Sequence, residues 1–274
     1  MIPDNESELK KCLRELSGDN RQYKLIGKGS NILFPDDPLF DTVVSTGGLV
    51  AYAIAKGEGD ETFITASSGA ALSELAGFAA KSGLTGLEFA GGIPGSLGGA
   101  LRMNAGAYGG EMANIVETIN AYDPLTDKVY HLSNAECRFA YRKSLFVFSE
   151  AVSESPLIIL SARLKLTSDE PEKIRQRTAD LLKRRKKSQP LDYPSAGSVF
   201  KKPGADIHPA AIIDRLGLKG CCVGDACVSE KHAGFVINKG NATAEDVEAL
   251  IGIIKARVLK EAGIELNTEI EIIR

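Results

Sequence analysis

Hydrophobic and polar positions at the start of the chain recur with the period of an amphipathic helix. Leu9, Leu13 and Leu16 fall on one face of residues 6–17, and the polar side chains just before them can cap a helix. The short apolar run "QYKLI" follows and predicts a strand that leads into the turn "GKGSN". The pattern therefore predicts a helix, a strand and a glycine turn, in that order.

The same two periods recur along the rest of the chain. Runs of apolar residues predict strands at 61–66, 114–123, 128–132, 156–166 and 267–274. Apolar stripes predict helices at 67–83 and after Thr243, where Asp246 completes a capping-box pattern. Pro171 near the start and the basic run at the end predict a further helix at 171–187. Because strands and helices alternate irregularly, without an internal repeat or long linker, we expect an α+β fold rather than a regular βαβ series.

Two glycine-containing segments are candidates for binding an anion, "GKGSN" at 27–31 and the glycine-rich but apolar stretch at 83–110. Glycine lets backbone N–H groups approach a ligand, and successive N–H groups form a concavity that binds anions. Either segment alone is equally well explained as a tight turn that packs backbones together. The pair favours a ligand, because two such loops can clamp a pyrophosphate. Neither segment is a P-loop or a Rossmann fingerprint.

Composition narrows the class of protein. The chain has 274 residues, 43 % hydrophobic and 25 % charged, so it can bury a substantial core and hold two or three domains. The balance of 33 basic and 36 acidic residues argues against a dedicated nucleic-acid binder. No apolar run approaches the roughly 20 residues that span a bilayer, and the acidic N-terminus is unlike a signal peptide. We therefore expect a cytoplasmic protein without a membrane or nucleic-acid partner.

The five cysteines do not suggest a disulfide framework, because their number is odd and their spacing irregular. Cys221, Cys222 and Cys227 cluster, but they lack the paired spacing of a zinc site, so no metal is expected. With Cys12 and Cys137, they are expected to be small buried hydrophobes in a reducing compartment.

Two polar residues stand in contexts that permit chemistry. Arg142 lies in "FAYRKSLF", where an arginine can hold a carboxylate by two parallel hydrogen bonds. Taken alone, a structural arginine paired with an acid is the better explanation. Ser198 lies in the turn "PSAGSVFKKP", where it either bonds its own backbone or donates a proton. The residues after Ser198 exclude the GxSxG nucleophile elbow.

A basic run, a histidine and a glutamate each have a structural explanation as well as a possible functional one. The basic run 184–187 suits a solvated helix end that complements the helix dipole, although it would also attract a phosphate-bearing substrate. His232 has an apolar context that favours a satisfied core histidine. Glu269 alternates with Ile270 in the final strand, which is also the pattern of an exposed carboxylate.

Together these segments resemble one family. In the family's order, the chain contains "GKGSNILF", "GLEFAGGIPGSLGGALRMNAGAYGGE", "FAYRKSLF", "QPLDYPSAGSVFKKP", "AAIIDRLGLKGCCVGDACVSEKHAGFVIN" and "LNTEIEII". They are similar to the UDP-N-acetylenolpyruvoylglucosamine reductases, the FAD enzymes that complete UDP-N-acetylmuramate for peptidoglycan. The match spans roughly residues 24–273. The lack of a long tyrosine-bearing insertion between the Arg142 and Ser198 segments resembles the shorter subtype.

The resemblance implies an α+β fold with a two-part FAD-binding domain of the vanillyl-alcohol-oxidase type and a C-terminal α+β substrate domain. The implied divisions are 1–47 with 268–274 for the first FAD-binding lobe, 48–187 for the second, and 188–267 for the substrate domain. Cofactor binding is implied for the glycine segments and one serine: Gly27, Lys28, Gly29, Ser30, Asn31, Ile32, Ser68, Gly92, Ile93, Gly95, Ser96, Gly99, Asn104, Gly106 and Ala107. Substrate binding is implied for Tyr141, Arg185, Lys187 and Lys202.

The resemblance also implies a reaction for a monomeric enzyme with small-molecule partners only. NADPH, as co-substrate, would reduce the flavin and be replaced by the enolpyruvyl sugar nucleotide. Hydride from flavin N5 would then reach C3 of the enolpyruvyl group. Arg142 and Glu269 would stabilise the negative charge that develops at C2 and the carboxylate, and Ser198 would deliver a proton to C2.

The sequence departs from the family pattern in two places. The family begins with an "NTFRIGG"-like run and a strand before the first helix, whereas this chain begins at Met1-Ile2-Pro3, so we expect it to lack residues that line the flavin site in relatives. Lys202 stands where many relatives have asparagine.

Two other functions remain open. One is a different flavin oxidoreductase on the same scaffold, such as an alcohol or sugar oxidase. The other is a flavin-free nucleotide-sugar binding protein. The joint presence of Arg142, Ser198 and Glu269 argues against the latter.

Overall fold

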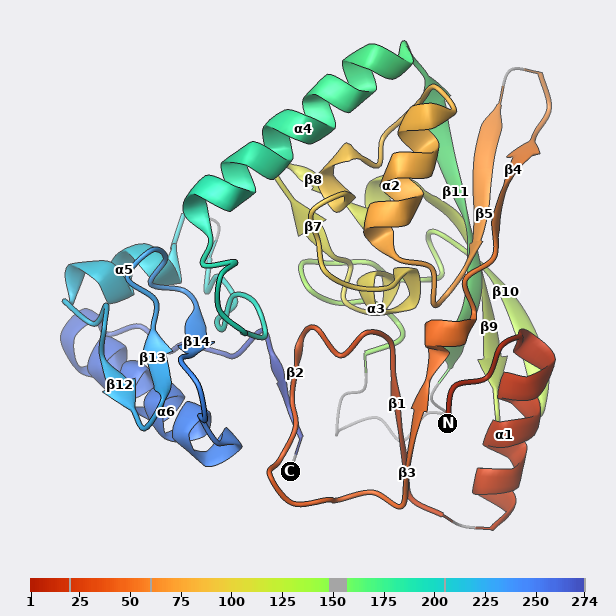
Figure 1. The fold of residues 1–274 in the computed structure, drawn as a ribbon. Helices are drawn as coiled ribbons and strands as arrows, with labels where there is room; N and C mark the ends of the chain where they lie inside the picture. Colours follow the sequence, from red (N-terminus) through yellow and green to blue (C-terminus); the bar gives the residue numbers. More distant parts are fainter. Residues whose placement is uncertain (20, 60, 148–156, 205, 274) are drawn as a thin grey trace. The chain divides into compact units, whose positions relative to one another are not determined.

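The computed structural model describes residues 1–19, 21–59, 61–147, 157–204 and 206–273, and the chain divides into two compact units. The first unit comprises Met1–Gly29 and Phe40–Lys183. The second comprises Ser30–Leu39 and Arg184–Arg274. Figure 1 shows helices and strands in both, as the α+β expectation requires.

A six-stranded antiparallel sheet forms the centre of the first unit. Its strands run in the order β10-β9-β11-β5-β4, and β6 pairs with the end of β11. Their bounds are β4 Tyr52–Lys56, β5 Thr62–Ser67, β6 Leu84–Thr85, β9 Val116–Asp123, β10 Lys128–Ser133 and β11 Ile158–Ser168. Within the described residues, the runs predicted as strands at 61–66, 114–123, 128–132 and 156–166 therefore supply four strands of this sheet, whereas β4 and β6 were not predicted.

Helices cover the sheet and complete the core of the first unit. On one face lie α2 (Leu72–Lys81) and the short α3 (Leu97–Arg102), which share one apolar cluster with residues of β5, β9 and β11 (Figure 1). Neighbouring residues of a strand point to opposite faces, so Ala121 joins this cluster while Tyr122 joins a second one.

The second cluster is built around α1 (Glu6–Gly18), as the leucine stripe predicted. Its leucines at positions 9, 13 and 16 are buried, and the Asn5 side chain caps the helix by accepting a hydrogen bond from the Glu8 N–H. The following strand β1 (Tyr23–Ile26) pairs in parallel with β3 (Thr42–Ser45). The backbone of Met1 lies beside β3, because its amine donates to the Val43 carbonyl at 2.7 Å and its carbonyl accepts from the Ser45 N–H at 2.9 Å.

Short elements make up the glycine-rich part of the first unit. They are η1 (Thr46–Gly48), η2 (Glu88–Ala90), α3, the two-residue strands β7 (Gly106–Ala107) and β8 (Gly110–Glu111), and η3 (Met112–Asn114). The predicted helix at 171–187 is present as α4 (Pro171–Ser188). Arg177 of α4 forms ion pairs with Glu88 at 2.9 Å and Asp169 at 2.6 Å.

The second unit packs two helices on a small antiparallel sheet. Strands β12 (Cys222–Val223), β13 (Ala226–Val228) and β14 (Val236–Asn238) share a core with α5 (Pro209–Arg215) and α6 (Ala244–Ala262). The predicted capping box of Thr243 and Asp246 opens α6. At the start of the same helix, the Ala244 N–H donates a hydrogen bond of 2.9 Å to the Asp36 carboxylate. This bond ties segment 30–39 to the second unit.

The predicted closing strand at 267–274 is wrong in extent. Within 267–273, the part of it that the structure describes, the only strand is β15 (Glu271–Ile272), paired in parallel with β2 (Ile32–Leu33). The residues before it pair with another segment instead, since the Lys201 N–H donates to the Asn267 carbonyl and the Glu269 N–H to the Val199 carbonyl. A change of partner thus divides the predicted strand.

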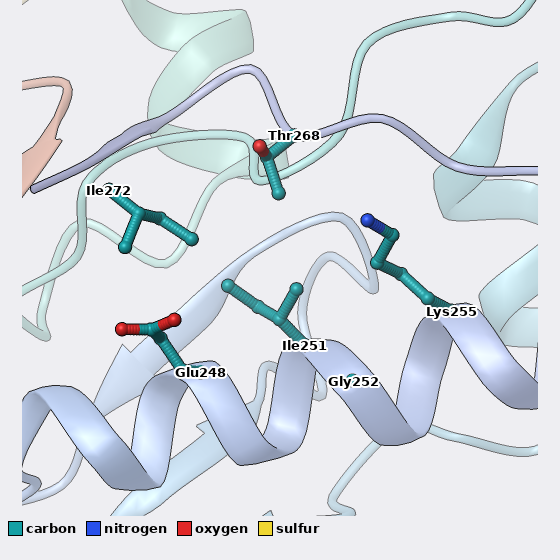
Figure 2. Close-up of a pocket in the computed structure, with 6 residues that line it drawn as sticks. All are labelled: Glu248, Ile251, Gly252, Lys255, Thr268 and Ile272. Atoms are coloured by element: carbon teal, nitrogen blue, oxygen red, sulfur yellow. The ribbon is translucent and has the colours of Figure 1, made fainter. Parts of the chain in front are cut away.

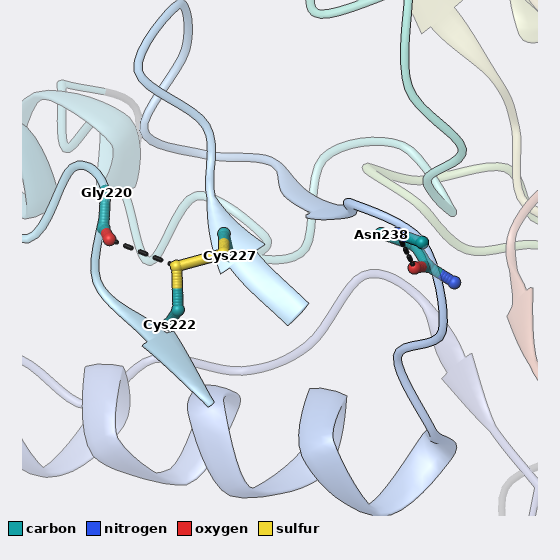
Figure 3. The surroundings of a disulfide bond; sticks show 5 residues. Gly220, Cys222, Cys227 and Asn238 are labelled. Atoms are coloured by element: carbon teal, nitrogen blue, oxygen red, sulfur yellow. Dashed lines mark hydrogen bonds between the residues drawn. A yellow bond between two sulfur atoms is a disulfide. The ribbon is translucent and has the colours of Figure 1, made fainter. Parts of the chain in front are cut away.

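Cys222 and Cys227 form a disulfide, so the expectation that all five cysteines are reduced is wrong for this pair (Figure 3). The two residues face each other across the β12–β13 hairpin, with Cα atoms 4.1 Å apart. A turn at 224–225 brings them together, which the spacing in sequence does not reveal. Cys12 and Cys137 are buried, as expected, and Cys221 is partly buried.

The predicted three-part division of the chain stays a prediction. The two units divide the chain at other residues, and 30–39 lies in the second unit with the C-terminal segment, to which β2 is joined through β15. Among the helices of the described ranges, none combines the length and apolar character needed to cross a membrane.

Candidate active site

The two glycine segments meet in the first unit. Gly27 lies so close to Ser96 that a Cβ atom at position 27 would overlap the Ser96 Oγ. A larger residue at position 27 would therefore require the Ser96 hydroxyl to move. The 95–97 loop is itself fixed by hydrogen bonds from the Leu97 N–H to the Ala70 carbonyl and from the Leu72 N–H to the Gly95 carbonyl.

Two buried hydroxyls in this region have no partner. The Oγ atoms of Ser68 and Ser96 make no hydrogen bond within the described residues, and each residue is only 1 % exposed. The two serines are linked through Gly98, whose N–H donates to the Ser68 carbonyl at 2.7 Å. A buried hydroxyl without a partner is costly, so a ligand that supplies the missing partner is the simplest explanation.

Unusual backbone conformations cluster after α3. Asn104, Tyr108 and Arg142 all have positive φ, at 45°, 54° and 54°. Residues other than glycine adopt such angles rarely, and they gather at functional sites because the surroundings must hold them. The Arg142 Nη2 donates to the Gly106 carbonyl at 3.2 Å, so these strained segments contact each other.

Arg142 lies in a tight two-residue turn. Ala140 and Lys143 exchange two backbone hydrogen bonds of 3.0 Å, which leaves Tyr141 and Arg142 at the tip. The guanidinium lies over the Tyr141 ring, 5.2 Å from its centroid. Tyr141 itself is 46 % exposed.

Ser198 and Glu269 lie on neighbouring backbone segments of the second unit. Val199 follows Ser198, and its carbonyl accepts from the Glu269 N–H at 2.7 Å. The other side of the Ser198 segment bridges to Phe235. Gly197, at φ 90°, provides the turn that precedes Ser198. Both Ser198 and Glu269 are partly exposed.

His232 braces this region in a way that sequence reasoning missed. Its Nδ1 accepts from the Gly234 N–H at 3.1 Å, and the Gly234 carbonyl accepts from the Val199 N–H at 2.8 Å. Burial lowers the pKa of His232 and so favours the neutral ring, in which Nδ1 accepts. The apolar context predicted a satisfied histidine, but only the fold shows what it supports.

Asn31, the last residue of the "GKGSN" turn, holds the segment that carries Glu269. Its Nδ2 donates to the Glu269 carbonyl at 3.0 Å, and its own carbonyl accepts from the Glu271 N–H at 2.9 Å. The two residues are 238 positions apart, so no local signal in the sequence could have predicted this contact.

Comparison with known proteins decides the family. Residues 1–128 match a family model described as an FAD binding domain, and 189–273 match one for the UDP-N-acetylenolpyruvoylglucosamine reductase C-terminal domain. The chain is 45 % identical to the UDP-N-acetylenolpyruvoylglucosamine reductase of Pseudothermotoga lettingae, over 91 % of this chain and 83 % of the relative. It belongs to the UDP-N-acetylenolpyruvoylglucosamine reductase family.

Two other members of the family are similar to this chain along its whole length. The Clostridium novyi reductase is 42 % identical over 100 % of this chain and 85 % of its own length. The crystal structure of the Thermus caldophilus reductase matches with a TM-score of 0.80 and 32 % identity, covering 100 % of this chain and 91 % of that one. The predicted fold class, an FAD-binding part followed by a C-terminal α+β domain, is thereby confirmed.

The residues of this reductase around Ser68, Ser96 and Gly27 fit FAD as a ligand. The hydroxyls of Ser68 and Ser96, which have no hydrogen-bond partner among the described residues, lie in the part that matches the FAD binding domain, and Gly27 lies close to the Ser96 side chain. Hydrogen-bond donors and closely approaching glycine backbone are what a pyrophosphate or flavin carbonyl requires.

The remaining predicted residues are divided between the two units. The first holds Lys28, Gly29, Gly92, Ile93, Gly95, Gly99, Asn104, Gly106, Ala107, Tyr141 and Arg142, and the second holds Ser30, Asn31, Ile32, Arg185, Lys187, Ser198, Lys202 and Glu269. Arg185 and Lys187 lie in the last turn of α4, and Lys202 is exposed. The functional roles of all these residues stay predictions.

The second unit also contains a pocket, shown in Figure 2. It has a volume of about 380 Å³ and is lined by Glu248, Ile251, Gly252 and Lys255 of α6 together with Thr268 and Ile272. None of the predicted site residues lines it. The described residues contain no cluster of three or more His, Cys, Asp or Glu side chains suited to a metal ion.

Proposed function

We propose that this chain reduces UDP-N-acetylglucosamine enolpyruvate to UDP-N-acetylmuramate with FAD as cofactor and NADPH as co-substrate, in peptidoglycan precursor synthesis. The observation that carries the proposal is the match to UDP-N-acetylenolpyruvoylglucosamine reductases along the chain, at 45 % identity to one relative. Arg142, Ser198 and Glu269 stand at the positions that the family resemblance assigns to catalysis. The chain is thus an FAD-dependent oxidoreductase.

FAD, when bound, supplies the redox chemistry by accepting hydride from NADPH and passing it to C3 of the enolpyruvyl group. The protein residues proposed to hold FAD are those around the two unpartnered hydroxyls, Ser68 and Ser96, and the glycine turn at 27–29. Their contribution is to fix the cofactor and to satisfy groups that are otherwise buried without partners.

Arg142 is proposed to stabilise the substrate carboxylate as negative charge develops on it. A guanidinium is permanently charged and forms two parallel hydrogen bonds with a carboxylate, which suits this task. Its turn is held in a strained conformation, with φ at 54°, and such strain is kept where the fold needs a side chain in one place. Placement before the reaction is what makes electrostatic stabilisation effective.

Ser198 is proposed to give the proton to C2, and Glu269 to stabilise the enolic species. A serine hydroxyl is a weak acid, so it can protonate only a strongly basic carbon centre, which the addition of hydride to the enolpyruvyl group creates. The Glu269 N–H donates to the carbonyl of Val199, the residue that follows Ser198. This hydrogen bond keeps Ser198 and Glu269 on adjacent segments and so supports a shared role in the reaction.

The diphosphate of the sugar nucleotide is proposed to meet the basic residues Arg185, Lys187 and Lys202, with Tyr141 as a further contact. All three cations lie in the second unit, and positive side chains attract an anionic substrate. We also propose that the enzyme is monomeric and acts in the cytoplasm.

The test is the visible spectrum of the purified protein together with an NADPH oxidation assay. We expect a yellow protein that oxidises NADPH continuously only when UDP-N-acetylglucosamine enolpyruvate is present. Colourless protein that also fails to take up added FAD contradicts the proposal. Rapid oxygen consumption with a neutral sugar would indicate another flavin oxidoreductase, and calorimetric binding of a UDP-sugar without flavin would indicate a binding protein.

A further inference from the structure

We infer that Asn104 is a positioning residue, because its side-chain amide holds the Ala140–Lys143 turn and thereby sets where Arg142 lies. The inference rests on the proposed function, in which Arg142 meets the substrate carboxylate. It assigns to Asn104 a role separate from the cofactor contact predicted from the sequence.

Asn104 is fully buried, and its amide is used at both ends. Nδ2 donates to the Ala140 carbonyl at 3.1 Å, and Oδ1 accepts from the Ala113 N–H at 2.9 Å. These partners are 36 and 9 residues away in sequence. One buried side chain therefore cross-links the start of the Arg142 turn to the 3₁₀ turn η3, and buried hydrogen bonds of this kind specify one arrangement.

The turn that carries Arg142 is anchored at its two ends. Asn104 holds its first residue, Ala140, while the Ser144 Oγ donates to the Arg102 carbonyl at 2.5 Å just after its last residue. The tip lies between these anchors with Arg142 at positive φ. A conformation so unfavourable for a residue with a side chain persists only while its surroundings enforce it, so loss of one anchor would let the turn relax.

Asn104 also carries the backbone that the Arg142 guanidinium contacts. Gly106 lies two residues after Asn104, and its carbonyl accepts from the Arg142 Nη2 at 3.2 Å. Gly106 is tightly packed, since a Cβ atom there would lie 2.7 Å from the Gly110 carbonyl oxygen. Asn104 is thus connected to Arg142 in two ways. Its side chain bonds the turn that carries Arg142, and its backbone leads to Gly106, whose carbonyl accepts from the Arg142 guanidinium.

The variant Asn104→Asp separates this role from packing. Aspartate has nearly the size of asparagine, tolerates positive φ and can still accept from the Ala113 N–H, but as a carboxylate it cannot donate to the Ala140 carbonyl. The matched control is Asn134→Asp. Asn134 Nδ2 likewise donates to backbone carbonyls, those of Ala113 and Val116 at 2.8 Å, but not to the Arg142 turn.

The first readout is amide hydrogen exchange, which needs no substrate. In Asn104→Asp we expect the amides of 140–143 to exchange at least about tenfold faster, the equivalent of one lost hydrogen bond, while those of β9 and β11 keep their rates. Asn134→Asp should leave 140–143 unchanged. Unchanged exchange at 140–143 in Asn104→Asp overturns the inference.

The second readout separates the two half-reactions. We expect Asn104→Asp to slow oxidation of the reduced enzyme by the enolpyruvyl substrate about 100-fold, the cost of misplacing a catalytic group by about 1 Å. Flavin reduction by NADPH, measured with saturating FAD, should stay within about threefold of wild type, because Arg142 is proposed to act only on the enolpyruvyl substrate. Equal losses in both half-reactions overturn the inference.

A double mutant and a pH profile complete the test. If Asn104 acts through Arg142, Asn104→Asp should cause no further loss in an Arg142→Ala background, whereas full additivity contradicts the role. Lowering the pH should restore activity in Asn104→Asp, because the protonated carboxyl can donate to Ala140 again. Wild-type protein that does not reduce the substrate contradicts the proposed function, while hydrogen exchange still decides whether Asn104 holds the turn.

Discussion

The backbone N–H of Glu269 donates a hydrogen bond of 2.7 Å to the carbonyl oxygen of Val199. This bond joins a segment near the C-terminus to the turn that contains Ser198, and Asn31 holds the same segment by donating to the Glu269 carbonyl at 3.0 Å. Two of the three proposed catalytic residues are therefore fixed by backbone contacts within one unit. Several expectations depend on this arrangement and on the unpartnered groups of the first unit.

Ser198→Ala should separate the two half-reactions. Ser198 is proposed to give a proton only after hydride has been transferred, so flavin reduction by NADPH should keep its wild-type rate. Formation of UDP-N-acetylmuramate should fall by about 100-fold or more, the usual contribution of a positioned proton donor. Stopped-flow absorbance of the flavin and chromatographic detection of product measure the two steps.

The control for this variant is Ser195→Ala, an exposed serine of the same loop that should leave both steps unchanged. Loss of both half-reactions in Ser198→Ala would show that Ser198 maintains the structure rather than donating a proton.

Ser96→Ala should weaken FAD binding without destabilising the protein that lacks FAD. The Ser96 Oγ is buried without a partner in the described residues, so its removal costs the free protein at most about 0.5 kcal/mol. If FAD is the missing partner, its Kd should rise about tenfold, the value of one hydrogen bond. Fluorescence titration with FAD and urea unfolding measure the two effects.

The exposed Ser73 of α2 provides the control, and Ser73→Ala should change neither quantity. A Ser96→Ala protein with unchanged FAD affinity would remove Ser96 from the proposed cofactor site.

Glu88 should contribute to the acid sensitivity of the first unit. Burial alone would raise the pKa of Glu88, but hydrogen bonds from Thr85, the Gly86 N–H and Arg177 hold it below the usual 4.5. Since the pKa is lower in the folded state, the stabilisation is present above pH 4.5 and is lost as the pH falls through the folded value. Glu88→Gln should lower the unfolding free energy at pH 7 by about 1–2 kcal/mol.

Urea unfolding between pH 7 and pH 3 checks the effect of Glu88, with the exposed Glu74→Gln of α2 as control. The wild type and Glu88→Gln should converge in stability at the acid end. A constant difference across the whole range would contradict the assigned pKa direction.

The disulfide predicts a simple thiol count. Protein denatured without reductant should titrate three thiols, from Cys12, Cys137 and Cys221, and five after reduction. Peptide mass spectrometry should place the bridge between Cys222 and Cys227. Five thiols in unreduced protein purified under air would contradict the bridge.

Local signals in the sequence were sufficient for several of the helices and strands in the two units. The leucine stripe of α1, the apolar runs of β5, β9 and β11, and the capping box of α6 depend on residues within a few positions of each other. Such neighbours interact whatever the rest of the chain does, so period and capping chemistry predict them. The sequence also determined the family, since six segments match in order.

Contacts between distant residues were decided only by the tertiary structure. The division of the last strand, the Cys222–Cys227 bridge and the bond from Asn31 to Glu269 each depend on strand pairing or register. Likewise, only the fold shows that the Ser68 and Ser96 hydroxyls are buried without partners among the described residues and that the Asn104 amide holds the Arg142 turn. Pairing between remote segments is selected by the packing of the whole unit, and no local pattern of residues records it.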